Sequence, residues 1–221
     1  MTALFNSYIY EPILSVLVFI YQNIAFQDLG VSIIILTLLV RTVLFPLFYK
    51  GAKDQTIMQQ LQPQIKKIQT DHKNDKEKQA KALMSLYKEN KLNPFSGFFL
   101  LLIQLPVFIA LFQLFNKELE TSTFDTHSFL GLISLNEKNL SVTLITALLQ
   151  YYQGKLSLPK QTNQDKSPNP MIMTGKAMVW IGPIITFFVL SALPAALGVY
   201  WFTSTTFSIL QQFYINKKIK K

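Results

Sequence analysis

The feature that most constrains the fold is one arginine, Arg41, inside a long apolar segment. Residues 31–49 read VSIIILTLLVRTVLFPLFY, and every other basic residue of the chain is a lysine. A guanidinium stays protonated in proteins, and at the centre of a membrane helix it costs roughly 3 kcal/mol on insertion scales. The fold must therefore supply water, an acid or another polar partner. An ionised side chain at membrane depth is a functional-site hypothesis by default.

The composition is typical of a polytopic membrane protein. The 221 residues are half apolar, and only 15% are charged, against about 25% in ordinary soluble domains. The charges gather between long uncharged runs. Cysteine is absent from the sequence, and the two histidines, His72 and His127, fall in separate loops. Neither a phosphate-binding loop nor a nucleophile elbow occurs, so we expect no catalytic site, no cofactor and no metal site, and hence no enzyme.

Five apolar segments are expected to span the membrane. The Arg41 segment is the first, and the others are residues 95–115, 140–152, 177–193 and 195–215. The third is short, which implies tilted neighbours or a locally thin bilayer. Residues 4–26 contain a continuous apolar stretch of only nine residues, 13–21, which favours a helix lying in the interface over a sixth span. No cleavable signal peptide is expected.

Lysine distribution predicts the orientation. No lysine or arginine precedes Val40, whereas residues 50–91 hold ten lysines. Acidic residues outnumber lysines in 116–139, and lysines outnumber acids in 154–176 and in the C-terminal tail. Because basic loops stay in the cytoplasm, the N-terminus is expected outside and the C-terminus inside.

The first cytoplasmic loop is expected to form two antiparallel amphipathic helices. Apolar residues recur at helical spacing at Ile57, Leu61, Ile65 and Ile68, and again at Ala80, Leu83, Met84 and Tyr87. Residues 71–75 between the two stripes predict a turn, and Pro63 should kink or restart the first helix. Residues 158–170 are rich in Gln, Asn, Ser and Pro and predict a flexible loop.

The five expected spans contain no acidic residue, so Arg41 has no evident salt-bridge partner at its depth. Three interpretations follow: Arg41 reaches an interface, binds polar groups in a dry bundle, or lines a water-filled cavity. The polar groups for the second are Thr42, Gln104, Gln150 and Ser204. We favour the cavity, because an unmatched buried charge is so costly.

Five motifs in order resemble the YidC/Oxa/Alb family of membrane protein insertases over essentially the whole chain. They are residues 37–46 (TLLVRTVLFP), 61–69 (LQPQIKKIQ), 87–97 with 102–108 (YKENKLNPFSG and LIQLPVF), 152–157 (YQGKLS), and 193–201 with 211–212 (LPAALGVYW and QQ). The large external domain of some members, a long basic tail and a lipoprotein cysteine are absent from the sequence.

The resemblance implies an all-α protein with five transmembrane helices around a hydrophilic groove. Residues 1–28 would form an external interfacial amphipathic helix, and residues 29–221 the insertase core, with a cytoplasmic helical hairpin at 50–92. The activity implied is insertion and folding of nascent membrane proteins, through a groove open to the cytoplasm in the bacterial plasma (inner) membrane. The implied groove residues are Arg41, Gln104, Gln150, Gln153, Tyr200 and Trp201.

The resemblance also implies partners. The hairpin lysines expected to recruit substrates or partners are Lys66, Lys67, Lys73, Lys76 and Lys78. Nascent membrane proteins and membrane lipids are the expected partners, the Sec translocon, signal recognition particle and ribosome are candidates, and no specific nucleic acid is expected. Two other functions are weighed against insertion: a small anion transporter or channel that uses Arg41 as its binding site, and a passive assembly scaffold.

Overall fold

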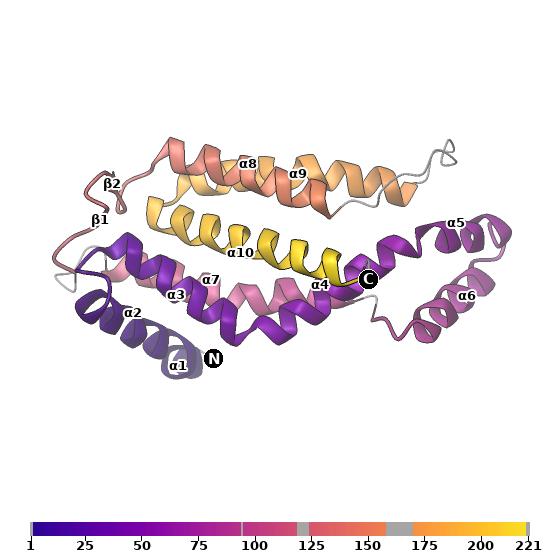
Figure 1. Cartoon of the computed structure of the whole chain (residues 1–221), viewed down its shortest axis with the longest axis horizontal. Helices are drawn as coiled ribbons and strands as arrows, with labels where there is room; N and C mark the ends of the chain where they lie inside the picture. Colours follow the sequence, from indigo (N-terminus) through magenta and orange to yellow (C-terminus); the bar gives the residue numbers. More distant parts are fainter. Residues whose placement is uncertain (1, 94, 119–123, 158–169, 220–221) are drawn as a thin grey trace.

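The computed structural model describes residues 2–93, 95–118, 124–157 and 170–219. The architecture is helical, with one small antiparallel hairpin, as Figure 1 shows. The prediction of an all-α protein is confirmed at this level. The predicted flexible loop at 158–170 lies outside the described residues except for its last position.

The chain begins with a nearly continuous helical segment that packs on the bundle. It consists of α1 (Thr2–Phe5), a short π-helical stretch η1 (Asn6–Tyr10) and α2 (Glu11–Asn23). One face of α2 buries Leu17, Ile20 and Tyr21 against α3 (Leu29–Val43) and α7 (Ser96–Glu118). This segment therefore contributes to the main core. Its placement in a membrane interface stays a prediction.

The first expected span is broken, which corrects the single helix predicted over 31–49. After α3, Leu44 leaves the helical path, and α4 (Phe45–Gln60) continues at 70°. Pro46 explains the break: it has no N–H to bond to the preceding turn, and its ring would clash with a carbonyl of that turn. At the start of α4 the missing N–H is harmless. Arg41 consequently lies in the last turn of α3 rather than in mid-helix.

The remaining expected spans correspond to helices. They are α7, which contains Pro106, α8 (Leu140–Leu156), α9 (Pro170–Ala192), which contains Pro183, and α10 (Ala195–Ile219). Among the described residues, no single helix is both long and apolar enough to cross a membrane, whereas the bent pair α3–α4 is, by length and composition. Shorter apolar stretches occur at Leu102–Lys117 and Val179–Ala192.

The exposed surfaces of α8 and α9 are apolar. The buried residues of α8 are Thr143, Thr146 and Ala147, while its exposed face carries Leu140, Leu144, Ile145, Leu148 and Tyr152. In α9 the exposed residues include Trp180, Ile181, Ile184, Ile185 and Phe188. Small and polar residues between helices with large apolar residues outside are typical of helices packed in lipid. Continuous exposed apolar surface of this kind marks an interaction or membrane surface.

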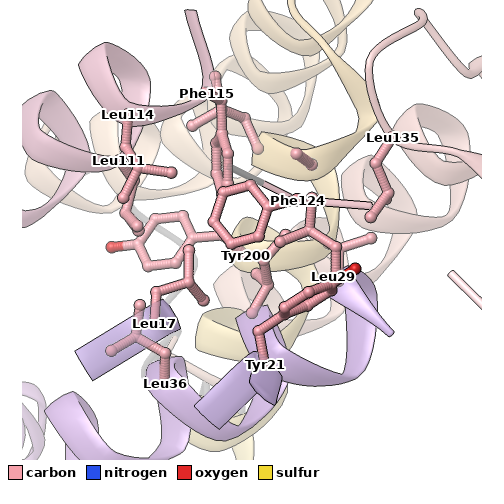
Figure 2. Packing of buried hydrophobic residues seen from close by; sticks show 14 of the residues in the cluster. Leu17, Tyr21, Leu29, Leu36, Leu111, Leu114, Phe115, Phe124, Leu135 and Tyr200 are labelled. Carbon is pink, nitrogen blue, oxygen red and sulfur yellow. The ribbon is translucent and has the colours of Figure 1, made fainter. Parts of the chain in front are cut away.

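The main core closes one end of the bundle. In Figure 2 the ring of Phe124 lies among side chains from α2, α3 and α7, and its centroid is 5.1 Å from that of Tyr21. The hydroxyl of Tyr21 accepts a hydrogen bond of 3.0 Å from the Thr126 amide. Asp28 caps α3 through Val31 N at 2.8 Å and also accepts from Leu130 N at 2.6 Å. These contacts fix the loop that carries the strands β1 (Ser128–Phe129) and β2 (Ile133–Ser134) onto the α2–α3 corner.

The helical hairpin lies at the other end, where Figure 1 shows α5 and α6 projecting from the bundle. α4 ends at Gln60, and α5 (Gln62–Asp71) restarts with Pro63 in its first turn, as predicted. α6 (Lys76–Glu89) follows the predicted turn, with Asp75 as its N-cap. The Lys78 amide and ammonium hold the pKa of Asp75 below its ordinary value.

The two apolar stripes of the hairpin cover each other. Leu61, Ile65, Leu86, Tyr87 and Leu92 form a small core separate from the main one. Two expected members, Ala80 and Met84, are exposed instead. The cause is a rotation of α6, which faces α5 through the side chains at positions 83, 86 and 87, one helical turn apart.

Candidate functional site

A cavity of about 460 Å³ lies between the helices on the hairpin side of the main core. This volume is in the range of small-molecule pockets, so the cavity holds a few side chains rather than a whole helix. Five of the elements around it, α3, α4, α7, α8 and α10, each contribute a polar or aromatic side chain. The lining residues are Arg41, Phe48, Gln104, Leu105, Phe108, Gln150, Gln153, Val189, Tyr200, Trp201, Ser204, Thr205 and Ser208.

All six residues expected in the groove lie around this one cavity. They come from segments up to 160 residues apart in sequence: Arg41 is in α3, Gln104 in α7, Gln150 and Gln153 in α8, and Tyr200 and Trp201 in α10. The structure thus assembles them, while their role toward a substrate stays a prediction.

Arg41 is held on two sides. The side chain of Ser204 accepts hydrogen bonds from Nε, at 3.0 Å, and from Nη2. On the other side the Phe48 ring centroid is 4.4 Å from Cζ, a cation–π distance. Arg41 is 9% exposed, and no described carboxylate lies within ion-pair distance of it. Its full charge is therefore compensated only by neutral groups of the described chain.

The interpretation of Arg41 as bound by polar groups holds in part, and the water-filled cavity stays a prediction. Ser204 is the one predicted polar group that binds it; the hydroxyl of Thr42 instead donates to Leu38 O at 2.7 Å. A guanidinium has five N–H groups, and Ser204 receives two of them. Within the described residues the other three find no protein acceptor, and the side chain borders the cavity. This arrangement leaves donors for water or for a polar group that enters.

Gln150 and Gln104 connect the walls of the cavity. The side-chain oxygen of Gln150 accepts hydrogen bonds from Thr186 Oγ1 at 2.6 Å and from Trp201 Nε1 at 3.0 Å, which joins α8, α9 and α10. Gln104 Nε2 donates to the hydroxyl of Tyr200 across the α7–α10 contact. These bonds hold polar atoms of the cavity walls in fixed positions.

A polar stripe on α10 leads from the cavity toward the hairpin end. Ser204, Ser208, Gln212 and Asn216 follow one another at four-residue spacing, which places them along one side of the helix. Gln212 Nε2 donates to Thr56 Oγ1 of α4 at 2.9 Å and to Asn216 Oδ1 at 3.0 Å. Sequence reasoning missed Ser208, Phe48 and this stripe, although the four-residue repeat was a readable signal.

None of the predicted recruitment lysines lines the cavity. Lys66 and Lys67 are on α5, Lys73 is in the turn, and Lys76 and Lys78 are on α6. Lys78 Nζ lies 3.2 Å from Asp75 Oδ2, an exposed pair of small energetic value. In the described residues no three or more His, Cys, Asp or Glu side chains gather as a metal site would require.

Comparison with known proteins identifies relatives over most of the chain. A family model described as "60Kd inner membrane protein" matches residues 19–221. The "Membrane protein insertase YidC" of Oceanobacillus iheyensis is 32% identical over 195 residues, which cover 86% of this chain and 75% of that protein. The "Membrane protein insertase YidC 2" of Listeria innocua is 31% identical over 223 residues, covering 99% and 74%. The "Membrane protein insertase YidC" of a Geobacter species is 30% identical over 210 residues, covering 95% and 37%.

Proposed function

Because this chain belongs to the YidC/Oxa/Alb family of membrane protein insertases, we propose that it inserts nascent membrane proteins through the Arg41 cavity. The relatives named as insertases support the activity itself. The observation that supports the route is a guanidinium held by neutral groups, beside a cavity, in a bundle with apolar outer faces.

The proposed mechanism divides the substrate between two environments. Its polar tail enters the cavity, where the Arg41 charge attracts acidic groups far more strongly than it would in bulk water. Its apolar helix passes along the exposed faces of the bundle into lipid, and burial of that helix supplies roughly 25 cal/mol per Å². No nucleotide is required for this step.

The length of α8 supports a short path for the polar tail of the substrate across the hydrocarbon core. Its 17 residues extend about 25 Å, less than the roughly 30 Å hydrocarbon core of a bilayer. A short helix is accommodated by a locally thinner bilayer. The proposed consequence is that a polar tail crosses less hydrocarbon beside α8 than elsewhere.

The membrane arrangement is proposed as follows. The bent α3–α4 unit, α7, α8, α9 and α10 provide five spans, with the N-terminus outside, the C-terminus in the cytoplasm and residues 1–28 in the outer interface. The groove opens to the cytoplasm and holds the six groove residues, Arg41, Gln104, Gln150, Gln153, Tyr200 and Trp201. The hairpin with Lys66, Lys67, Lys73, Lys76 and Lys78 recruits nascent chains; the Sec translocon, signal recognition particle, ribosome and lipids are candidate partners.

A small anion transporter or channel is not favoured. It would also use Arg41, but the relatives named above carry the name insertase, and anion binding by Arg41 leaves the basic hairpin unexplained.

The test is rescue of cells depleted of their own insertase of this family, followed by site-specific crosslinking to nascent membrane proteins. Arg41→Ala should lower insertion of substrates with acidic tails on the order of tenfold, and substrates with neutral tails less. Arg41→Lys should retain more activity than Arg41→Ala, because the charge matters more than the fork geometry. Thr42→Ala, a neighbour outside the cavity lining, is the matched control. Normal insertion by Arg41→Ala would reject the proposal.

A further inference from the structure

Two tyrosines mark a junction between α4 and α10 on the hairpin side of the cavity. The ring centroids of Tyr49 and Tyr214 are 6.2 Å apart, and Lys218 Nζ lies 5.8 Å from the Tyr49 centroid. Phe45 and Phe207 extend the aromatic contact toward the bundle. The junction therefore brings a lysine and two tyrosines from distant parts of the sequence into one exposed corner.

The exposed surfaces of α4 and α10 both change from apolar to basic at these two tyrosines. On α4 the exposed Leu47 is followed by Tyr49 and Lys50, and on α10 the exposed Phe213 is followed by Tyr214 and Lys217. Because the two tyrosines are in contact, the two changes occur at the same depth. Tyrosines at the boundary between apolar and basic surface are typical of the membrane–water interface.

The charge at the corner is strongly positive. Lys50 and Lys53 on α4 and Lys217 and Lys218 on α10 are all exposed. Between residues 29 and 70 the sequence contains a single acid, Asp54, and α10 contains none. Asp54 is buried and accepts a hydrogen bond of 2.6 Å from Ser96 Oγ, so its carboxylate is directed to α7 rather than to the lysines.

We propose that this corner binds the phosphate headgroup of an anionic phospholipid of the cytoplasmic leaflet. The corner is defined by Tyr49, Lys50, Lys53, Tyr214, Lys217 and Lys218. Lysines bind phosphate as point charges, and the exposed apolar residues just before the tyrosines contact the acyl chains. The site is separate from the insertion cavity and requires only that the chain lie in a membrane with the orientation proposed above.

Purified full-length protein in neutral detergent is titrated with phosphatidylglycerol, and the retained lipid is counted by native mass spectrometry. A lysine near a membrane surface contributes roughly fivefold to the affinity for anionic lipid. Lys50→Gln/Lys53→Gln/Lys218→Gln should therefore weaken binding of the first lipid by at least about fivefold. The control, Lys67→Gln/Lys73→Gln/Lys76→Gln, removes the same amount of charge from the hairpin. It should change the affinity for the first lipid less than about twofold.

Three further arms make the result decisive. Lys50→Arg/Lys53→Arg/Lys218→Arg keeps the charge and should retain the lipid, which separates loss of the site from loss of the fold. Phosphatidylcholine should bind more weakly, and soluble glycerol phosphate should not displace phosphatidylglycerol. Equal losses of lipid affinity in the corner and hairpin variants would show that only the net charge of the protein matters, and would overturn the proposal. Full displacement by glycerol phosphate would also overturn it, by indicating a free-phosphate site.

Discussion

The hydroxyl of Ser204 holds the guanidinium of Arg41 by accepting from both Nε and Nη2, with Nε at 3.0 Å. One hydroxyl on α10 thus fixes the direction of the charge that α3 brings to the cavity. Phe48 of α4 covers the guanidinium from another side, at 4.4 Å. Arg41 is consequently oriented by two helices other than its own.

Ser204→Ala should leave Arg41 in place but less ordered. Insertion of substrates with acidic tails should fall roughly threefold to tenfold, less than in Arg41→Ala, because cavity water replaces part of the lost hydrogen bond. Ser204→Thr should retain activity. Ser208→Ala is the control, since that hydroxyl also borders the cavity but donates to Ser204 O at 3.0 Å. Equal activity of Ser204→Ala and the wild type would show that the orientation is unimportant.

Gly198 permits close contact between α10 and α8. A Cβ atom at Gly198 would lie 2.7 Å from Val142 Cγ1, closer than real contacts allow. Gly198→Ala should therefore lower stability by about 1–3 kcal/mol through overpacking, measured as thermal melting in detergent. Val142→Ala in the same chain should restore it. Gly182→Ala, whose Cβ would meet Gln150 at 3.4 Å, is the mild control.

The topology can be tested by thiol labelling, because the sequence contains no cysteine. Leu132→Cys, at a position 84% exposed in the β1–β2 loop, should react with an impermeant reagent added outside intact cells. Asn74→Cys, in the hairpin turn, should react only after permeabilisation. Labelling of Asn74→Cys in intact cells would reverse the proposed orientation.

Hairpin charge should matter for capture and not for core stability. Lys73→Gln/Lys76→Gln/Lys78→Gln should weaken crosslinking to nascent chains, while the melting temperature of the bundle stays nearly unchanged, because the hairpin has its own small core. Lys→Arg at the same positions is the charge-preserving control. Normal capture together with earlier melting would make the hairpin a structural brace.

Low pH should destabilise the first turn of α6. The Lys78 amide and ammonium lower the pKa of Asp75 in the folded state, so the cap contributes stability above the ordinary carboxyl pKa of 3.8. That contribution is lost as the pH falls through the lowered folded value. The hydrogen-exchange rates of the first turn of α6 in the wild type and in Asp75→Asn should differ above pH 4. The two rates should become equal well below pH 4. A difference independent of pH would contradict this assignment.

The sequence predicted the positions of the helices better than their bends and contacts. Pro194 separates α9 from α10 as expected, since proline ends a helix locally. Pro46 carries the same local signal, but the apolar run through Arg41 outweighed it, and the break at Leu44 was missed. An apolar segment whose backbone is bent still looks like one continuous helix in the sequence, because hydropathy carries no information on backbone geometry.

The cavity was partly predictable. Arg41 and Gln150 stand out because polar residues are rare within apolar segments, and Tyr200 and Trp201 entered through the family motif. Phe48 gave no such signal, since an aromatic residue beside lipid is ordinary; its ring contacts Arg41 across the 70° bend between α3 and α4. The rotation of α6 was also beyond sequence reasoning, because adjacent faces of that helix are similarly apolar.

The bend at Leu44 has an electrostatic consequence for Arg41. A helix that ends has carbonyl groups without helical partners, and these give its C-terminus a partial negative charge. Because α3 ends here, that charge lies within one turn of the guanidinium. A cation at such a position gains about 0.3–1 kcal/mol when exposed and up to about 2 kcal/mol when partly buried, against the roughly 3 kcal/mol of placing it in the membrane. Because Pro46 interrupts the span, backbone carbonyl groups at the end of α3 supply part of the negative charge that a carboxylate would otherwise provide for Arg41.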